Sequence, residues 1–194
     1  METVSSKDLN SPEEFDLIWH NRLGDTFATR KLYIYEELSL KYIKEHSSIL
    51  EIGCGDGYFL RHIRSYIKNT TVYGIDSSRV AIDYANNIYN VPCEVLDFKN
   101  LNYFKTYDVV MCHQTIEHLQ NPEELINVCI KLLNEGGILI ISSVTSAFNY
   151  DRMHLWSFSE EDFKGYFSKL KNVNIELLDV TSRSKSIIVG IGIK

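Results

Sequence analysis

The stretch that most constrains this fold is residues 48–60, which read SILEIGCGDGYFL. An apolar run that carries one acid, Glu51, breaks into the alternating glycines Gly53, Gly55 and Gly57, and an amphipathic segment follows. This order predicts a buried strand, a tight turn and a helix. Glycines at such a turn permit positive φ and let a ligand approach the backbone without meeting a Cβ atom. The stretch therefore predicts that a nucleotide-like cofactor lies across a strand-to-helix turn.

The spacing of the glycines separates the cofactor classes. The dinucleotide fingerprint is G-x-G-x-x-G, but here the third glycine comes one residue early and Tyr58 occupies its place. No Gly-Lys-Ser/Thr follows, which a phosphate-binding loop requires. The turn reads Glu-x-Gly-x-Gly-x-Gly and resembles the first motif of the class I S-adenosylmethionine (SAM)-dependent methyltransferases, in which it wraps the methionine and ribose of SAM. The resemblance implies cofactor contacts from Glu51, Gly53, Cys54, Gly55 and Gly57.

Composition narrows the class of protein further. The 194 residues fit one domain, with 20 basic and 26 acidic side chains and a net charge of −6. No Lys/Arg run marks a nucleic-acid footprint, and no stretch is apolar enough to span a bilayer. The N-terminus lacks an apolar signal core, and the four cysteines show no CxxC pair. We therefore expect a cytoplasmic protein with free thiols that does not bind nucleic acid and has no membrane span.

The first 46 residues predict a helical cap before the core at 47–194. Ser-Pro-Glu-Glu opens a helix at Pro12, because serine caps and proline suits the first turn. Apolar spacing predicts a longer helix over about 26–45. A similar leader often covers the cofactor in the resembled family, which implies a lid role for Trp19 or His20. The alternative is that Trp19 simply packs on the core.

Two further strand ends carry acids. The strand at residues 71–76 ends in Asp76, about 20 residues beyond the glycine turn, where a carboxylate meets ribose hydroxyls. A carboxylate only accepts, so it can take both hydroxyl hydrogens, with Ser77 beside it. This resembles the second motif of the family. In that family an acid and its neighbour at the third strand's exit hold adenine, which Asp97 and Phe98 match; alternatively Asp97 caps the next turn.

The fourth strand, predicted at residues 106–112, runs directly into His113 and then His118. DVVMCHQTIEHLQNPEEL resembles the matching segment of a branch that includes quinone-precursor and sugar methyltransferases. The Asn/Asp-Pro-Pro-aromatic motif of the amino-methylating nucleic-acid enzymes is absent. Catechol-type enzymes place a metal-binding aspartate where His113 or Gln114 stands here. The resemblance therefore implies that no metal is required.

The rest of the chain completes a doubly wound α/β fold. The short link after the sixth strand forces antiparallel pairing of the last two strands. We expect a seven-stranded, mostly parallel sheet with a terminal antiparallel hairpin, as in class I methyltransferases. The expected elements are a helix from Pro122 to the glycines at 136–137, strands at 138–142, 173–180 and 186–193, a polar loop at 144–157 and a helix that Ser159 caps.

Methyl transfer from SAM is an in-line displacement, so the enzyme must mainly align the acceptor and exclude water. A base helps when the acceptor is a hydroxyl or ammonium, by about 10²–10⁴-fold, and histidine titrates in the right range. His113, His118 and His154 are the candidate catalytic residues, with His113 also a candidate cofactor contact. Each is alternatively a structural or substrate-positioning histidine. The loop side chains Tyr150, Arg152 and Trp156 suit a ring or sugar with an anionic group.

The favoured function is transfer of a methyl group from SAM to a small molecule, at a hydroxyl oxygen. An N-methyltransferase is one alternative. A catalytically silent SAM-binding subunit that scaffolds or activates a partner is another, because cofactor residues can persist while an acceptor pocket is lost. An NAD-linked oxidoreductase is disfavoured by the displaced third glycine and the terminal hairpin. The sequence leaves the acceptor and the oligomeric state open.

Overall fold

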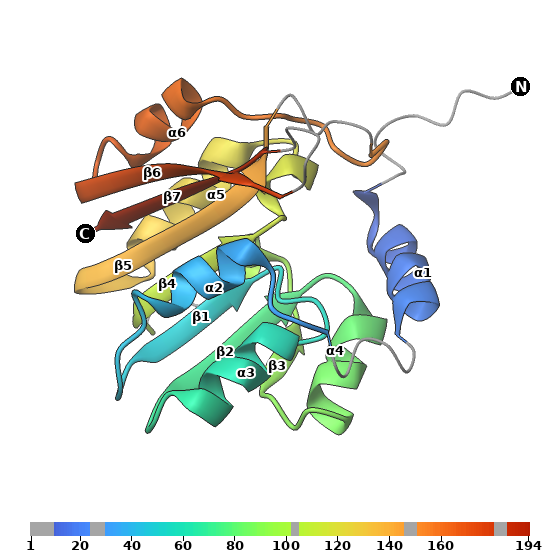
Figure 1. The fold of residues 1–194 in the computed structure, drawn as a ribbon. Coiled ribbons are helices and arrows are strands. Elements are labelled where there is room, and N and C mark those ends of the chain that lie inside the picture. The colour runs from blue at the N-terminus through green and yellow to red at the C-terminus, as the bar shows by residue number, and fades with distance from the viewer. Residues whose placement is uncertain (1–9, 24–29, 102–104, 146–150, 181–185) are drawn as a thin grey trace, which may run out of the picture.

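The computed structural model describes residues 10–23, 30–101, 105–145, 151–180 and 186–194. Their strands form one sheet in the order β3-β2-β1-β4-β5-β7-β6 (Figure 1). All neighbours are parallel except β7, which is antiparallel to both β5 and β6. The strands are β1 (Ser48–Ile52), β2 (Thr71–Asp76), β3 (Cys93–Val95), β4 (Tyr107–His113), β5 (Leu133–Val144), β6 (Lys171–Asp179) and β7 (Ser186–Ile193). This confirms the predicted seven-stranded sheet with its terminal antiparallel hairpin, whose link at 181–185 lies outside the described residues.

Helices cover both faces of the sheet, which explains why its central strands carry mostly apolar side chains on both faces. Ile49 of β1 packs in one core with α2, α3 and α4, while Leu50 and Ile52 pack in the opposite core with α5 and α6. The alternation follows from the two-residue period of a strand. The helices are α1 (Pro12–Arg22), α2 (Ile34–Leu40), α3 (Tyr58–Tyr66), α4 (Arg79–Asn87), α5 (Pro122–Lys131) and α6 (Glu160–Phe167), with 3₁₀ turns η3 (Phe98–Asn100) and η4 (Ile116–His118).

Helix α1 stands apart from the sheet, beside α4 (Figure 1). As predicted, Ser11 caps it, accepting from the Glu14 amide. The Asp16 carboxylate accepts from the Ser78 hydroxyl at 2.6 Å and from the Val80 amide at 3.1 Å. None of its residues is buried. Helix α1 is therefore held by the polar contacts of Asp16 and by the rings of Phe15 and Trp19, which lie against His118 and Gly55, rather than by a core of its own.

The long helix predicted over 26–45 is wrong in its extent. Within the described residues helix α2 begins only at Ile34, because Tyr33 is extended and the Glu36 carboxylate accepts from the Tyr33 amide, which caps the helix there. Helix α2 ends at Leu40, and the next amides, of Lys41 and Tyr42, bond three residues back and tighten the turn. The predicted start near residue 26 lies outside the described residues.

Helix α5 also ends earlier than predicted, at Lys131 rather than at the glycine pair. The Leu132 carbonyl accepts from the Tyr107 amide at 2.8 Å, and Leu133 pairs with Tyr107 in the sheet. Leu132 and Leu133 are fully buried, so burying them in the sheet ends the helix and starts β5 early. Gly136, at φ +76°, lies inside this strand rather than at a helix end.

Among the described residues, no helix is both long enough and apolar enough to cross a bilayer.

Candidate active site

A cavity of about 1550 Å³ opens at the carboxyl ends of β1 and β4. The strand order reverses between these two neighbours, and ligands of open α/β sheets bind at such a switch point. A pocket for one small molecule holds roughly 300–1,000 Å³. This cavity therefore has room for a cofactor and a second ligand. Its lining includes Trp19, Arg30, Glu51, Gly53, Cys54, Gly55, Asp76, Ser77, Asp97, Phe98, His113, Glu117, His118, Arg152 and His154.

The glycine turn has the predicted left-handed backbone at all three glycines, with φ of +74°, +52° and +71° at Gly53, Gly55 and Gly57. A Cβ on Gly53 would lie 2.1 Å from the Thr115 Oγ1, and one on Gly57 would lie 3.0 Å from the Ala85 Cβ. The space beside these two glycines is thus filled by protein side chains rather than left for a ligand. Their absent Cβ atoms let the turn pack tightly while its outer edge lines the cavity.

Trp19 lies against Gly55, since a Cβ on that glycine would come within 2.3 Å of the indole ring. Trp19 also lines the cavity, whereas His20 is exposed and does not. The structure therefore places Trp19, and not His20, where a lid residue must be. Cys54 is buried beneath the same turn.

Asp76 stands at the end of β2, where the sequence predicts it. Its Oδ2 accepts from the Gly55 amide and its Oδ1 from the Ser78 amide, each at 2.9 Å. Burial raises the pKa of this carboxyl, and the backbone hydrogen bonds partly offset the rise. The Ser77 amide also bonds to this carboxylate, and its remaining acceptor capacity is available to a ligand. Ser77 lines the cavity beside it.

Asp97 and Phe98 lie farther along the same wall. The Asp97 Oδ1 accepts from the Lys99 amide at 2.9 Å and so caps the 3₁₀ turn η3. Asp97 therefore does cap the next turn, which was the alternative role considered for it. Both residues also line the cavity, with the Phe98 ring largely buried. The geometry allows both roles.

His113 is tied into a buried network that joins β1, β4 and α2. Its Nδ1 lies 3.0 Å from the Glu51 Oε1, and its Nε2 lies 3.0 Å from the Ser39 hydroxyl. That hydroxyl donates its one hydrogen to the Tyr35 carbonyl, so the His113 Nε2 must carry a hydrogen itself. The contact with Glu51 likewise occupies Nδ1. No lone pair of His113 is left to act as a base, which favours a structural role.

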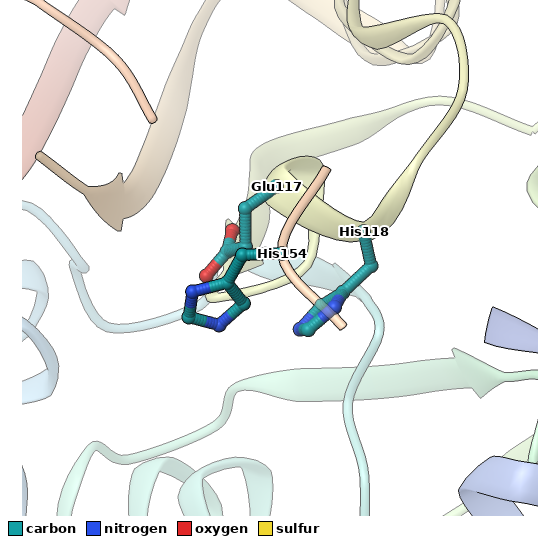
Figure 2. Close-up of side chains that lie close together, drawn as sticks. All are labelled: Glu117, His118 and His154. Carbon is teal, nitrogen blue, oxygen red and sulfur yellow. The ribbon is translucent and has the colours of Figure 1, made fainter. Parts of the chain in front are cut away.

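The opposite end of the cavity brings together Glu117, His118 and His154 (Figure 2). Each offers one ligand atom, and these atoms all lie within 4.8 Å of one another. The His118 Nδ1 lies 3.1 Å from the Met153 carbonyl, which can only accept. His118 is therefore the tautomer with Nδ1–H and a lone pair on Nε2. The two rings meet edge to face, with centroids 5.0 Å apart.

Burial sets the protonation of this cluster. It lowers the pKa of His118 to about 4, which the Met153 carbonyl partly offsets, and it lowers the pKa of His154 as well. Burial raises the pKa of the fully buried Glu117 carboxyl to about 7, although the Ser143 hydroxyl donates to its Oε2 at 2.8 Å. At neutral pH both imidazoles are neutral and have lone pairs available.

Arg30 is a lining residue that the sequence argument missed. It forms a bidentate ion pair with Glu36, at 2.6 and 2.7 Å, and lies 4.4 and 4.2 Å from the ring centroids of Tyr33 and Tyr58. The pair could not be read from the sequence, because the predicted helix over 26–45 placed Arg30 in regular structure.

Of the three loop side chains expected to contact the acceptor, Tyr150, Arg152 and Trp156, only Arg152 is found at the cavity within the described part of the chain. Arg152 lines the cavity. Trp156 does not: its indole Nε1 donates to the Leu119 carbonyl at 2.8 Å, and 44% of the residue is exposed. The expectation that Trp156 faces a ligand is therefore wrong. Tyr150 lies outside the described residues.

Three features together define the class of protein: the order of the strands, the glycine turn after β1 and the carboxylate of Asp76 at the end of β2. They are those of the Rossmann-like fold of the class I SAM-dependent methyltransferases. The comparison with protein families agrees. A family model described as "Methyltransferase domain" matches residues 25–175, and the chain belongs to that family. The resemblance inferred from the motifs is thereby confirmed.

The curated relatives are moderately similar to this chain in sequence. A putative methyltransferase 235L of Invertebrate iridescent virus 6 is 26% identical over 143 residues, which are 70% of this chain and 54% of the viral protein. The ubiquinone biosynthesis O-methyltransferase of Rickettsia bellii (strain OSU 85-389) is 29% identical over 155 residues, 74% of this chain and 64% of that protein. The chain thus spans between about half and two thirds of the length of these relatives.

Solved structures share the fold. The N-methyltransferase NodS from Bradyrhizobium japonicum WM9, in complex with S-adenosyl-L-homocysteine (SAH), matches with a TM-score of 0.76 at 18% identity, over 95% of this chain and 98% of NodS. Phosphoethanolamine N-methyltransferase 2 of Haemonchus contortus, in complex with SAM, matches with a TM-score of 0.76 at 14% identity, over 99% of this chain and 60% of that one. Among these relatives and neighbours, both O- and N-methyltransferases are named.

Proposed function

We propose that this chain transfers a methyl group from SAM to a small-molecule acceptor, at a hydroxyl oxygen. The observation that carries the proposal is the single cavity that joins the Asp76 end to the Glu117–His118–His154 end. One end offers what a nucleoside cofactor needs, and the other offers proton-accepting groups. Because the chain covers only part of its relatives' length, the activity is proposed from this chain's own residues.

The cofactor end fits the chemistry of SAM. The acceptor capacity that the Asp76 carboxylate keeps beyond its backbone hydrogen bonds suits the ribose hydroxyls. The Glu51 Oε2 is buried without a hydrogen-bond partner among the described residues, and a ligand ammonium would satisfy it. Arg30 bonds to Glu36 and to the Lys31 carbonyl through three of its N–H groups, which leaves others for a ligand carboxylate. SAM carries each of these groups.

Helix α1 completes the cofactor end in this proposal. Residues up to 46 act as the cap, and Trp19 is its lid residue, because its ring lies on Gly55 and faces the cavity. Polar contacts of Asp16 rather than a buried core hold α1 in place. An element held in this way can open for exchange of SAM and SAH at low cost.

The acceptor end favours oxygen over nitrogen. A hydroxyl must lose its proton during methyl transfer, as must an ammonium, whereas an amine that is already neutral attacks through its free lone pair. The neutral imidazoles of His118 and His154 and the nearby Glu117 carboxyl supply that assistance. Alignment of acceptor and SAM contributes further, up to roughly 7–11 kcal/mol in ideal cases. The names of the O-methyltransferase relatives point the same way.

The experiment is a methyl-transfer assay with isotopically labelled SAM and a panel of phenols, sugars and amines. We expect a methylated hydroxyl product and a rate loss of about 10²–10⁴-fold in His118→Ala. His62→Ala is the matched control, because His62 stacks on Tyr66 outside the cavity. Methylation of amines alone would replace the oxygen proposal with N-methylation. SAH binding without transfer to any acceptor would support the silent-subunit alternative.

A further inference from the structure

We propose that Glu117, His118 and His154 form a binding site for a divalent transition-metal ion, which holds the acceptor's hydroxyl oxygen for methylation. The inference deepens the proposed function, on which its catalytic part rests. The ion-binding part stands on geometry alone and can be tested without turnover.

The three side chains converge from two separate segments (Figure 2). Glu117 and His118 lie on η4, directly after β4, and His154 lies on the segment between β5 and α6. Their candidate ligand atoms are all within 4.8 Å of one another. A four-coordinate ion with bonds of about 2.0–2.2 Å needs ligand atoms roughly 3.4 Å apart. Inward movement of about 1 Å, within the reach of side-chain torsions, would close the site.

Two buried polar atoms in the cluster lack partners among the described residues. They are the Glu117 Oε1 and the His154 Nδ1. Glu117 is fully buried, and both residues line the cavity. Leaving such groups unsatisfied costs the folded state their full desolvation penalty. A cation between them would satisfy both atoms at once.

The groups behind the cluster are those that support metal ligands. The His118 ring donates its Nδ1–H to the Met153 carbonyl, which aims Nε2 away from that carbonyl. The Ser143 hydroxyl holds the other oxygen of Glu117. A ligating histidine typically donates its second N–H to a carbonyl or carboxylate, and a ligating carboxylate is itself hydrogen-bonded. Both supports are already in place.

The ligand types select the class of ion. Two imidazoles and one carboxylate suit borderline ions such as Zn²⁺, Co²⁺, Mn²⁺ or Fe²⁺ rather than Mg²⁺ or Ca²⁺, which prefer oxygen ligands. Three protein ligands leave a coordination position open, as catalytic sites require. All three ligand residues line the cavity that the acceptor would enter, so an acceptor can reach the open position.

An ion here would activate the acceptor as follows. Coordination of the hydroxyl oxygen lowers its pKa, and its proton leaves to water. The oxygen then forms the new C–O bond to the SAM methyl group while the C–S bond breaks. The electron pair of that bond goes to sulfur, which gives neutral SAH. In the rival arrangement the His118 Nε2 takes the proton directly and no ion is needed.

The test uses protein without an affinity tag, stripped with a chelator and dialysed. Titration with Co²⁺, followed by visible absorption, reports both stoichiometry and the nitrogen–oxygen environment, and Zn²⁺ competition reports affinity. The variants are Glu117→Gln, which keeps the side chain's shape, and His154→Gln, which is less buried and serves if the first does not fold. His62→Gln is the control. SAH binding is measured on every preparation.

We expect about one Co²⁺ per chain, with an affinity loss of at least 10–100-fold in both cluster variants and none in the control. Chelator treatment should remove methyl transfer and leave SAH binding intact. The proposal is overturned if no ion binds, if binding survives both variants, or if the stripped protein keeps full activity. Failure of SAH binding would instead overturn the proposed function, and the ion titration would then test the metal site alone.

Discussion

Replacing His113 by leucine tests whether the buried Glu51–His113–Ser39 network is structural. Both partners of the pair are 5% exposed at the side chain, and the ring nitrogens of His113 have partners at 3.0 Å on each side. Leucine approximates the volume of the ring but forms neither hydrogen bond. The Glu51 Oε1 and the Ser39 hydroxyl, both buried, would each lose a partner.

The expected cost follows from that burial. Breaking a buried pair by removing one partner typically costs about 3–5 kcal/mol. Burial raises the pKa of Glu51, so the carboxyl can take up a proton in the variant, which favours the lower end of this range. For a chain of this size 1 kcal/mol moves the melting temperature by about 2–4 °C. We therefore expect His113→Leu to melt roughly 6–12 °C below the wild type.

Urea unfolding at neutral pH, followed by circular dichroism, measures this free energy. His62→Leu is the control, because His62 only stacks on Tyr66 at the surface of α3. The double variant Glu51→Leu/His113→Leu should lose less than the sum of the single losses, because it leaves no orphaned charge. A loss below about 1 kcal/mol for His113→Leu, together with abolished methyl transfer, would refute the structural role and restore His113 as a base.

Three further predictions follow from the turn, the lid and the sheet. Gly55→Ala should weaken SAH binding at least about 10-fold, because Ala strains at φ +52° and its Cβ meets Trp19; calorimetry should show partial recovery in Gly55→Ala/Trp19→Ala. Asp16→Ala should free α1 and speed its limited proteolysis, with little change in global unfolding. Hydrogen bonds from Ser48 and Asn134 lower the pKa of Asp108 below 3.8, so its stabilisation is complete above that value and is lost as pH falls through the lower folded-state pKa; acid titrations of Asp108→Asn should lack this loss.

The fold could be predicted because its signals are local. The strand–glycine–helix order at 48–60 and the acid at Asp76 fix the first βαβ unit and the cofactor edge of the sheet. Serine caps at positions 11 and 159 mark helix starts by short-range hydrogen bonds, and both are found. The five-residue link before β7 left only antiparallel pairing.

The misplaced boundaries and the site's partners depend on contacts distant in sequence. Helix α5 ends early because Leu133 pairs with Tyr107, which no local pattern in the helix reveals. His113 looked like a base in the sequence, but its partners come from β1 and α2. His118 and His154 are 36 positions apart in the sequence, and they come close together only in the folded chain, where both line the cavity. Motifs thus locate the strand ends, whereas the pairing of side chains there is a property of the folded chain.

The central claim is that the Asp76 end of the cavity binds SAM, and calorimetric titration of the purified chain with SAH tests it most directly. We predict saturable SAH binding, no binding of NAD, and an affinity about 10–100-fold lower in Asp76→Asn, which loses one charge-assisted acceptor. Binding of NAD in place of SAH would contradict the account. A folded chain that ignores SAH would contradict it as well, as would SAH affinity unchanged by Asp76→Asn.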